Sequence, residues 1–304
     1  MDAVHKSGTN KKYKRALNLF LNYCNCVGDI IGGVDDLDEV LCEYIEYLHA
    51  SGGKLYQASD TVYALQFYYP KCKHWLLTAK LLLRGWNNIQ QKQYRPPLTW
   101  ELTVVLAVSM AKASHIAAAV ATLLSFDCYL RIGECLNLTV ADVAVGGNMH
   151  FGSAYTGMAV GLKHTKTGVN QFVKVREKAV EALLLLLIAG TWNGGVKFPL
   201  TAKLFPYTPA AYRSIFKSAC VSIGVGGVGF VPHSLRHGGA TRDFLLTVPL
   251  EDILIRGRWA VSKSARIYIQ SGQALLITVR APALQKLGAD IVASGDLVTF
   301  FEQI

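Results

Sequence analysis

The stretch "HSLRHGGAT" (residues 233–241), followed by "RWAVSKSARIYIQ" (residues 258–270), gathers histidines, arginines, a tryptophan and a tyrosine in the last quarter of the chain. A helix beginning near Pro232 would place His233 and Arg236 on one face, because residues three apart are neighbours on a helix. These segments predict a helical region that carries a basic site.

A second pair with the same spacing, Arg131 and Glu134, lies in "LRIGECL". The carboxylate can hold the guanidinium through a charge-assisted hydrogen bond. Arg131 and Arg236 both carry planar forks that match the non-bridging oxygens of a phosphate, and neither loses its charge at physiological pH. The two arginines therefore predict a site for a phosphate group.

The residue types form a coherent set for attack on a phosphodiester by Tyr268. A phenol with a pKa of about 10 is a poor nucleophile at neutral pH, so a base such as His233 must take its proton. The two arginines would stabilise the charge that develops on phosphorus oxygens. Lys166, at the turn "TKTG", is the candidate acid for the departing 5′ oxygen.

Each of these matches is weak when it is taken alone, since the chain has 8 His, 14 Tyr and 5 Trp. His233 could be a buried structural histidine, and Trp259 could be an ordinary core residue. Tyr207 and Tyr212 precede the H-x-x-R segment and so lie on the wrong side of it. The order and spacing of the whole set carry the prediction.

The first 95 residues predict helices, because apolar residues recur at three and four positions. Tyr13, Leu17 and Phe20 share one face in the first of them. "RPPLT" (residues 95–99) is typical of a linker, since consecutive prolines cannot continue a helix and the threonine can cap the next one. We therefore expect a helical domain over residues 1–95 and a second domain over residues 96–304.

The second domain is predicted to be mainly helical with a small antiparallel sheet, which makes the chain a mainly α, α+β protein. Its strands are expected in "MAVGLKH" (residues 158–164) and "QFVKVR" (residues 171–176), around the turn "TKTGVN". Helices are expected on both sides of this hairpin.

The formal net charge of +10 favours a polyanionic partner, and a hydrophobic fraction of 51% indicates a folded protein. Residues 71–95 hold six basic side chains and no acid, interleaved with aromatic residues. They are expected either to contact a phosphate backbone or to form an ordinary solvated helix face. The six are Lys71, Lys73, Lys80, Arg84, Lys92 and Arg95.

Membrane and metal sites are not expected. The longest apolar run, "ALLLLLIAG" (residues 182–190), is too short to cross a bilayer, and the first residues lack a signal-peptide core. Seven cysteines without a C-x-x-C pair support neither a disulfide framework nor a zinc site. The sequence predicts an intracellular protein, in a nucleus or a bacterial cytoplasm.

Four segments, "YLRIGECLNLTVADV", "TKTGVNQFVKV", "HSLRHGGAT" and "RWAVSKSARIYIQ", together resemble the catalytic domain of tyrosine recombinases, the phage integrase family. The helices before the linker resemble the core-binding domain of that family, which contacts DNA. The resemblance implies catalytic roles, with Tyr268 as nucleophile and Glu134 in a supporting position, for the set Arg131, Lys166, His233, Arg236, Trp259 and Tyr268.

The chain departs from the family in two places. Family members often have "LGH" or "GGW" where this chain has "GRW", and the additional Arg258 is expected to contact DNA. The hairpin holds both Lys163 and Lys166; its "TKTG" context favours Lys166 as the catalytic lysine. His237, next to Arg236, is expected to be structural or supporting.

By resemblance, the enzyme cuts and rejoins DNA strands through a 3′-phosphotyrosine without a cofactor or metal, as a dimer on one double-stranded site and a tetramer on two. The alternatives are a type IB topoisomerase, which shares the chemistry, and a DNA-binding protein of a mobile element that has lost catalysis. The tail, residues 272–304, is expected to dock either on a neighbouring protomer or on its own domain.

Overall fold

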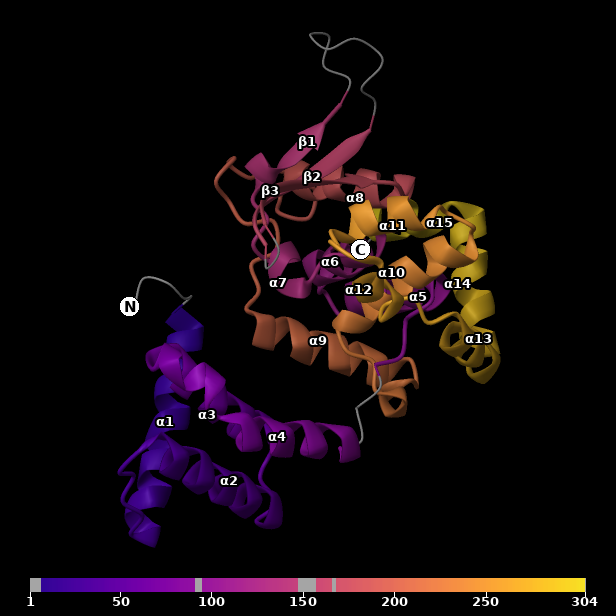
Figure 1. Cartoon of the computed structure of the whole chain (residues 1–304). Coiled ribbons are helices and arrows are strands. Elements are labelled where there is room, and N and C mark those ends of the chain that lie inside the picture. The colour runs from indigo at the N-terminus through magenta and orange to yellow at the C-terminus, as the bar shows by residue number, and fades with distance from the viewer. Residues whose placement is uncertain (1–6, 91–94, 147–156, 166–167, 304) are drawn as a thin grey trace. The chain divides into compact units, whose positions relative to one another are not determined.

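The computed structural model describes residues 7–90, 95–146, 157–165 and 168–303, and the chain divides into two compact units, residues 1–93 and 94–304 (Figure 1). The first unit is helical. Its elements are α1 (Ser7–Val27), α2 (Val34–Ala50), α3 (Leu55–Tyr68), the 3-10 helix η1 (Pro70–His74) and α4 (Leu77–Ile89).

The core of the first unit forms where α1 packs on α3 and α2 packs on α4. Phe20, Leu41 and Tyr44 are among its buried side chains, and they lie at the helical spacing that the sequence shows. Residues 70–89 do not form one continuous helix, because the chain turns after η1 and restarts at Leu77. The carboxylate of Asp38 in α2 caps this restart by accepting hydrogen bonds from the amides of Thr78 (3.0 Å) and Ala79 (3.1 Å).

The second unit is mainly helical and contains one small antiparallel sheet, which confirms the predicted fold class. Two buried helices form its centre, α5 (Trp100–Lys112) and α6 (Ile116–Asp127). Around them lie α7 (Ile132–Cys135), η2 (Val140–Asp142), α8 (Lys178–Ala189), α9 (Pro209–Ser222), η3 (Gly226–Val228), α10 (His233–Leu245), α11 (Leu250–Gly257) and α12 (Ser262–Arg266).

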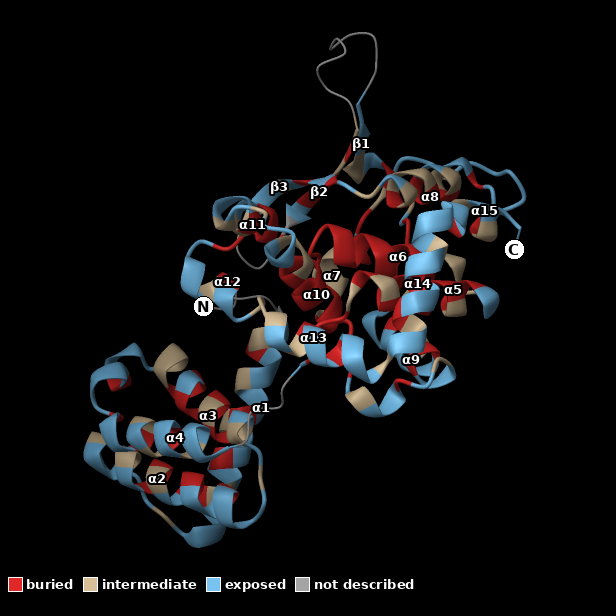
Figure 2. Ribbon diagram, turned by 90° about the vertical axis from the view of Figure 1, so that its right-hand side faces the viewer, coloured by how far each residue is buried: buried red, intermediate tan, exposed pale blue. Residues whose placement is uncertain are grey.

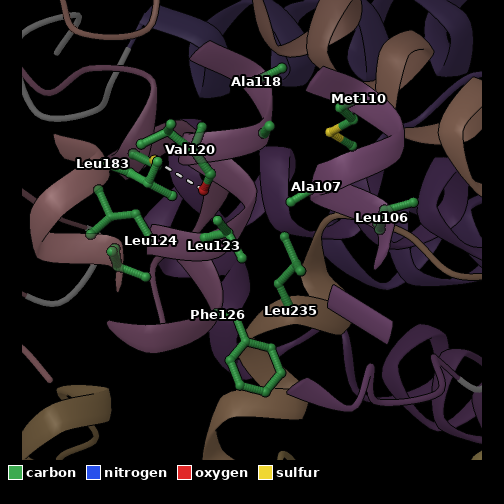
Figure 3. Close-up of a cluster of buried hydrophobic side chains, with 14 of the residues drawn as sticks. Leu106, Ala107, Met110, Ala118, Val120, Leu123, Leu124, Phe126, Leu183 and Leu235 are labelled. Atoms are coloured by element: carbon green, nitrogen blue, oxygen red, sulfur yellow. Dashed lines mark hydrogen bonds between the residues drawn. The ribbon is translucent and has the colours of Figure 1, made fainter. Parts of the chain in front are cut away.

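Figure 2 shows α6 and α10 as largely buried elements, and Figure 3 shows the side chains that meet between them. Leu123 and Phe126 of α6 lie beside Leu235 of α10, and Leu183 of α8 closes the cluster from another side. These four side chains are at most 1% exposed. The start of α10 is therefore fixed by the hydrophobic core.

The sheet has the strand order β1 (Val143–Val145), β2 (Met158–His164) and β3 (Val169–Val175). Val160 in β2 pairs with Val143 on one side and with Val173 on the other. The predicted hairpin corresponds to β2 and β3, whereas β1 was not predicted, because a three-residue strand carries too little pattern to recognise.

The C-terminal helices α13 (Ser271–Arg280), α14 (Pro282–Ser294) and α15 (Asp296–Glu302) pack against their own unit. The Thr99 hydroxyl donates to Gln285 Oε1 at 2.9 Å, and the Trp192 indole donates to the Phe301 carbonyl at 2.7 Å. Phe301 is fully buried. In the single chain the tail packs on its own domain, and its docking on a neighbouring protomer stays a prediction.

Candidate active site

The first turns of α10 carry two of the predicted residues, His233 and Arg236, and pack very closely against α6. A Cβ on Gly239 would lie 2.2 Å from the carbonyl oxygen of Phe126, which is much closer than two such atoms can approach. Glycine is required here, because any residue with a side chain would clash with α6 at this distance between the two helices. The glycines of "HGGAT" thus allow α10 to pack closely on α6, and this packing determines how deeply Arg236 is buried.

Arg236 is fully buried. Its guanidinium donates to the carbonyl oxygens of Tyr129 and Gly257, the latter at 2.6 Å. The same group lies 4.6 Å from the centre of the Trp259 ring and 5.1 Å from that of Tyr268. Burial, with the nearby arginine charges, lowers the pKa of Arg236 to about 10, so the group remains a cation at neutral pH.

Three buried donors around this site have no acceptor within the part of the chain that the structure describes. They are Nε of Arg236, Nε of Arg258 and Nε1 of Trp259. A buried donor without an acceptor loses its hydrogen bonds to water and gains nothing in exchange, so such groups are rare in proteins. Three of them around buried guanidinium groups form a pocket suited to the oxygens of an anion.

Arg131 precedes α7 and is held by Glu134 as its spacing predicted. The Arg131 guanidinium donates to Glu134 Oε1 at 2.7 Å, and the Arg131 backbone amide donates to Oε2 at 3.0 Å. The Arg131 side chain is 24% exposed, whereas that of Glu134 is 7% exposed. The carboxylate therefore holds a guanidinium that can still reach a ligand.

Arg258 lies inside the site, beside Glu134. Its side chain is only 4% exposed and donates to Glu134 Oε2 at 2.8 Å. The buried carboxylate attracts the guanidinium inward, because an ion pair offsets much of the cost of removing both charges from water. The contact of Arg258 with DNA stays a prediction.

Tyr268 lies in the turn after α12. Its ring centre is 4.7 Å from those of Trp259 and His237 and 5.4 Å from that of His233. The Thr241 hydroxyl on α10 donates to the Tyr268 carbonyl at 3.1 Å, which ties the turn to the helix. The half-buried phenol is therefore brought together with three of the other predicted residues.

Both histidines of α10 are uncharged at neutral pH. Burial, followed by the charge of Arg236, lowers the pKa of His233 to about 4; the charges of Arg95 and Arg131 act in the same direction. Burial, followed by His233, lowers the pKa of His237 to about 4. The Gln270 side-chain amide lies 3.1 Å from His237 Nδ1 and can donate to it. A neutral His233 is able to accept a proton.

Of the two candidate lysines of the hairpin, only Lys163 lies within the described residues; Lys166 lies outside them. Lys163 on β2 is exposed, and its ammonium forms an ion pair with Asp142 Oδ1 at 2.9 Å. This ion pair joins Lys163 on β2 to the end of η2. The preference for Lys166 as the catalytic lysine stays a prediction.

Of the basic residues predicted to contact DNA, Lys71, Lys73 and Arg84 are exposed on η1 and α4 of the first unit. Lys80 on α4 is partly buried and donates to the carbonyl of Lys73. Lys92 lies outside the described residues, and Arg95 is an exposed residue of the second unit. Their contact with DNA stays a prediction.

Sequence reasoning missed the buried charges beneath the site. Arg256 and Asp127 form an ion pair at 2.7 Å, and both side chains are at most 5% exposed. Tyr129, whose carbonyl accepts from Arg236, has a left-handed backbone (φ 49°), and its hydroxyl donates to Asp243. A charged Arg256 inside the otherwise apolar "ILIRG" was the available signal, but its partner lies far away in the sequence.

No cluster of His, Cys, Asp and Glu in the described ranges has the arrangement of a metal site. None of the helices in those ranges has both the length and the apolar character that a membrane crossing requires.

The fold is similar to that of the Tn1549 transposon integrase in complex with transposon right-end DNA, with a TM-score of 0.61 and 14% identity, covering 91% of this chain and 95% of that one. It is also similar to the XerH site-specific recombinase bound to its difH substrate, with a TM-score of 0.57 and 17% identity, covering 86% and 76%. No protein-family model and no curated protein matches the sequence. The chain thus has the tyrosine recombinase fold that its motifs predicted.

Proposed function

We propose that this chain is a DNA strand transferase of the tyrosine recombinase type, acting at specific sites. The observation that carries the proposal is the position of Tyr268, whose ring lies 5.1 Å from the buried Arg236 guanidinium and against Trp259. A nucleophile, a fixed cation and buried donors without acceptors share one pocket. This combination suits attack on a phosphodiester.

In the proposed reaction, the Tyr268 hydroxyl oxygen attacks a DNA phosphorus atom and the bond from phosphorus to the 5′ oxygen breaks. The phenolic proton passes to neutral His233, and Lys166 gives a proton to the departing 5′ oxygen. Arg131 and Arg236 hold the non-bridging oxygens, whose negative charge increases in the transition state. A 5′-hydroxyl from a partner duplex then attacks the 3′-phosphotyrosine and releases the enzyme.

A duplex nicked close to the cut site tests this chemistry, because loss of the short fragment that carries the free 5′-hydroxyl traps the covalent intermediate. We expect a denaturant-resistant adduct of protein and DNA that Tyr268→Phe abolishes, since phenylalanine has the same shape without the hydroxyl. Arg236→Ala should remove cleavage while DNA binding is largely retained. The control is Tyr212→Phe, which alters a buried tyrosine of α9 that hydrogen-bonds Thr122 away from the pocket.

The same assay separates the alternatives. A protein that binds DNA and never forms an adduct would be a DNA-binding protein without catalysis. Relaxation of supercoiled plasmid without a preferred sequence would identify a topoisomerase. Strand exchange between two duplexes is the result expected for a recombinase, and the mass of the complex on two sites would show whether four protomers assemble.

A further inference from the structure

Arg258 has a backbone conformation that normally selects glycine. It ends α11 with φ 56° and ψ 42°, in the left-handed region. A side chain disfavours this region because its Cβ crowds the backbone, and helices that end in this way usually do so with glycine. An arginine occupies this position against the backbone preference, so its side chain is the feature to explain.

That side chain shares one carboxylate with Arg131. Arg258 donates to Glu134 Oε2 at 2.8 Å, while the Arg131 guanidinium donates to Oε1 at 2.7 Å. Arg258 and Glu134 are nearly buried, with side chains 4% and 7% exposed. Two positive groups from distant parts of the chain are thus held on the two oxygens of one negative group.

The charges keep this arrangement ionised. Burial by itself raises the pKa of Glu134, but the charge of Arg258 and the hydrogen bonds from Arg131 outweigh it and leave the pKa below its ordinary value. The carboxylate therefore remains negative at neutral pH. A single negative charge cannot neutralise both guanidinium groups, so the site retains a net positive charge for a ligand.

Occupying Oε2 also limits how Arg131 can bind. Arginine and carboxylate prefer a two-point contact in which both oxygens accept from one guanidinium. Without Arg258, Oε2 would accept only from the Arg131 backbone amide (3.0 Å), and the Arg131 side chain could turn to contact both oxygens and direct more of its donors at Glu134. In the structure, the contact of its side chain with Glu134 is at a single oxygen.

We propose that Arg258 is a positioning residue that holds one oxygen of Glu134 and so keeps the remaining N–H groups of Arg131 directed at the DNA phosphate. The proposal rests on the proposed function, because it concerns the phosphate that this function would cleave. Arg258 itself need not touch the DNA.

A double-mutant cycle tests the link. Adduct formation is measured in single turnovers at saturating nicked duplex for the wild type, Arg258→Gly, Glu134→Gln and the double variant. We expect Arg258→Gly to slow the reaction on the order of 10- to 100-fold, as a small misplacement of a reacting group does, with little change in the Kd for DNA. The double variant should be no slower than Glu134→Gln, because Arg258 acts through Glu134.

Glycine is the informative substitution because it accepts φ 56° and relieves backbone strain, so the variant should fold. The matched control is Thr247→Gly, which alters another left-handed residue (φ 59°) that is exposed on the surface. Its rate should equal that of the wild type. An Arg258→Gly rate equal to that of the wild type, or independent costs that multiply in the double variant, would overturn the proposal.

A second measurement does not depend on cleavage. In ¹³C NMR titrations, the pKa of the Glu134 carboxyl should rise in Arg258→Gly and not in Thr247→Gly. An unchanged pKa would mean that Arg258 does not act on Glu134. If the wild type formed no adduct with DNA while this pKa rose as expected, the proposed function would fail and the link between the two residues would stand.

Discussion

At the scale of single residues, His233 and His237 link stability to pH. Burial and neighbouring positive charge hold the pKa of both at about 4 in the folded state, against about 6.5 in an unfolded chain. Between these values the unfolded state binds protons that the folded state does not. Stability should therefore be constant above pH 6.5 with respect to these groups and fall as the pH is lowered towards 4.

Urea unfolding at pH 7 and pH 4.5 measures this effect. Carboxylates also titrate in this window, so the informative quantity is the difference between the wild type and a His233→Asn, His237→Gln variant. We expect the wild type to lose about 1–3 kcal/mol more than the variant on acidification. Equal losses would contradict the neutral state of the two rings.

At this scale, an interaction could be predicted from the sequence only when its two residues are close together along the chain. The bond between Arg131 and Glu134 is local, since it joins residues three apart at the start of one helix. The burial of Arg258 depends on Glu134, which lies more than a hundred positions earlier, and no local pattern indicates it. The ion pair of Arg256 with Asp127 was missed for the same reason.

At the scale of secondary structure elements, the contact of α10 with α6 determines where the site lies. Gly239→Ala would place a methyl group 2.2 Å from the Phe126 carbonyl oxygen. We expect a loss of about 1–3 kcal/mol of stability, because overpacking forces the helices apart. Gly227→Ala is the control, since no atom lies within 4 Å of its Cβ position. Equal stability of the two variants would show that α10 can shift without cost.

The ends of helices and strands could likewise be predicted where local residues determine them, and not where a distant segment does. The first-unit helices α1 and α2 were predictable from their apolar spacing, and Thr99 caps α5 by accepting from the Leu102 amide at 3.2 Å. The start of α4 was not predictable, because its cap comes from Asp38 in another helix. Strand β1 was missed because its pairing with β2 is fixed by the sheet and not by its own three residues.

At the scale of the whole molecule, the net charge of +10 gives a prediction about binding. A protein that neutralises many DNA phosphates releases condensed counterions, and its affinity falls linearly with salt on logarithmic axes. We expect the affinity to fall about a thousandfold or more between 50 and 200 mM salt, as for proteins with six or more phosphate contacts. Titration of a labelled duplex by fluorescence anisotropy measures this slope.

Variants of the first unit then show where the contacts are made. If the exposed residues Lys71, Lys73 and Arg84 each bind a phosphate, replacing all three by alanine should reduce the slope by about three, because each lost contact removes nearly one counterion. Arg236→Ala should change the slope by at most one, since this single buried cation contributes little to the total. A triple variant with the wild-type slope would place those three side chains on a solvated helix face and assign the salt dependence to the second unit.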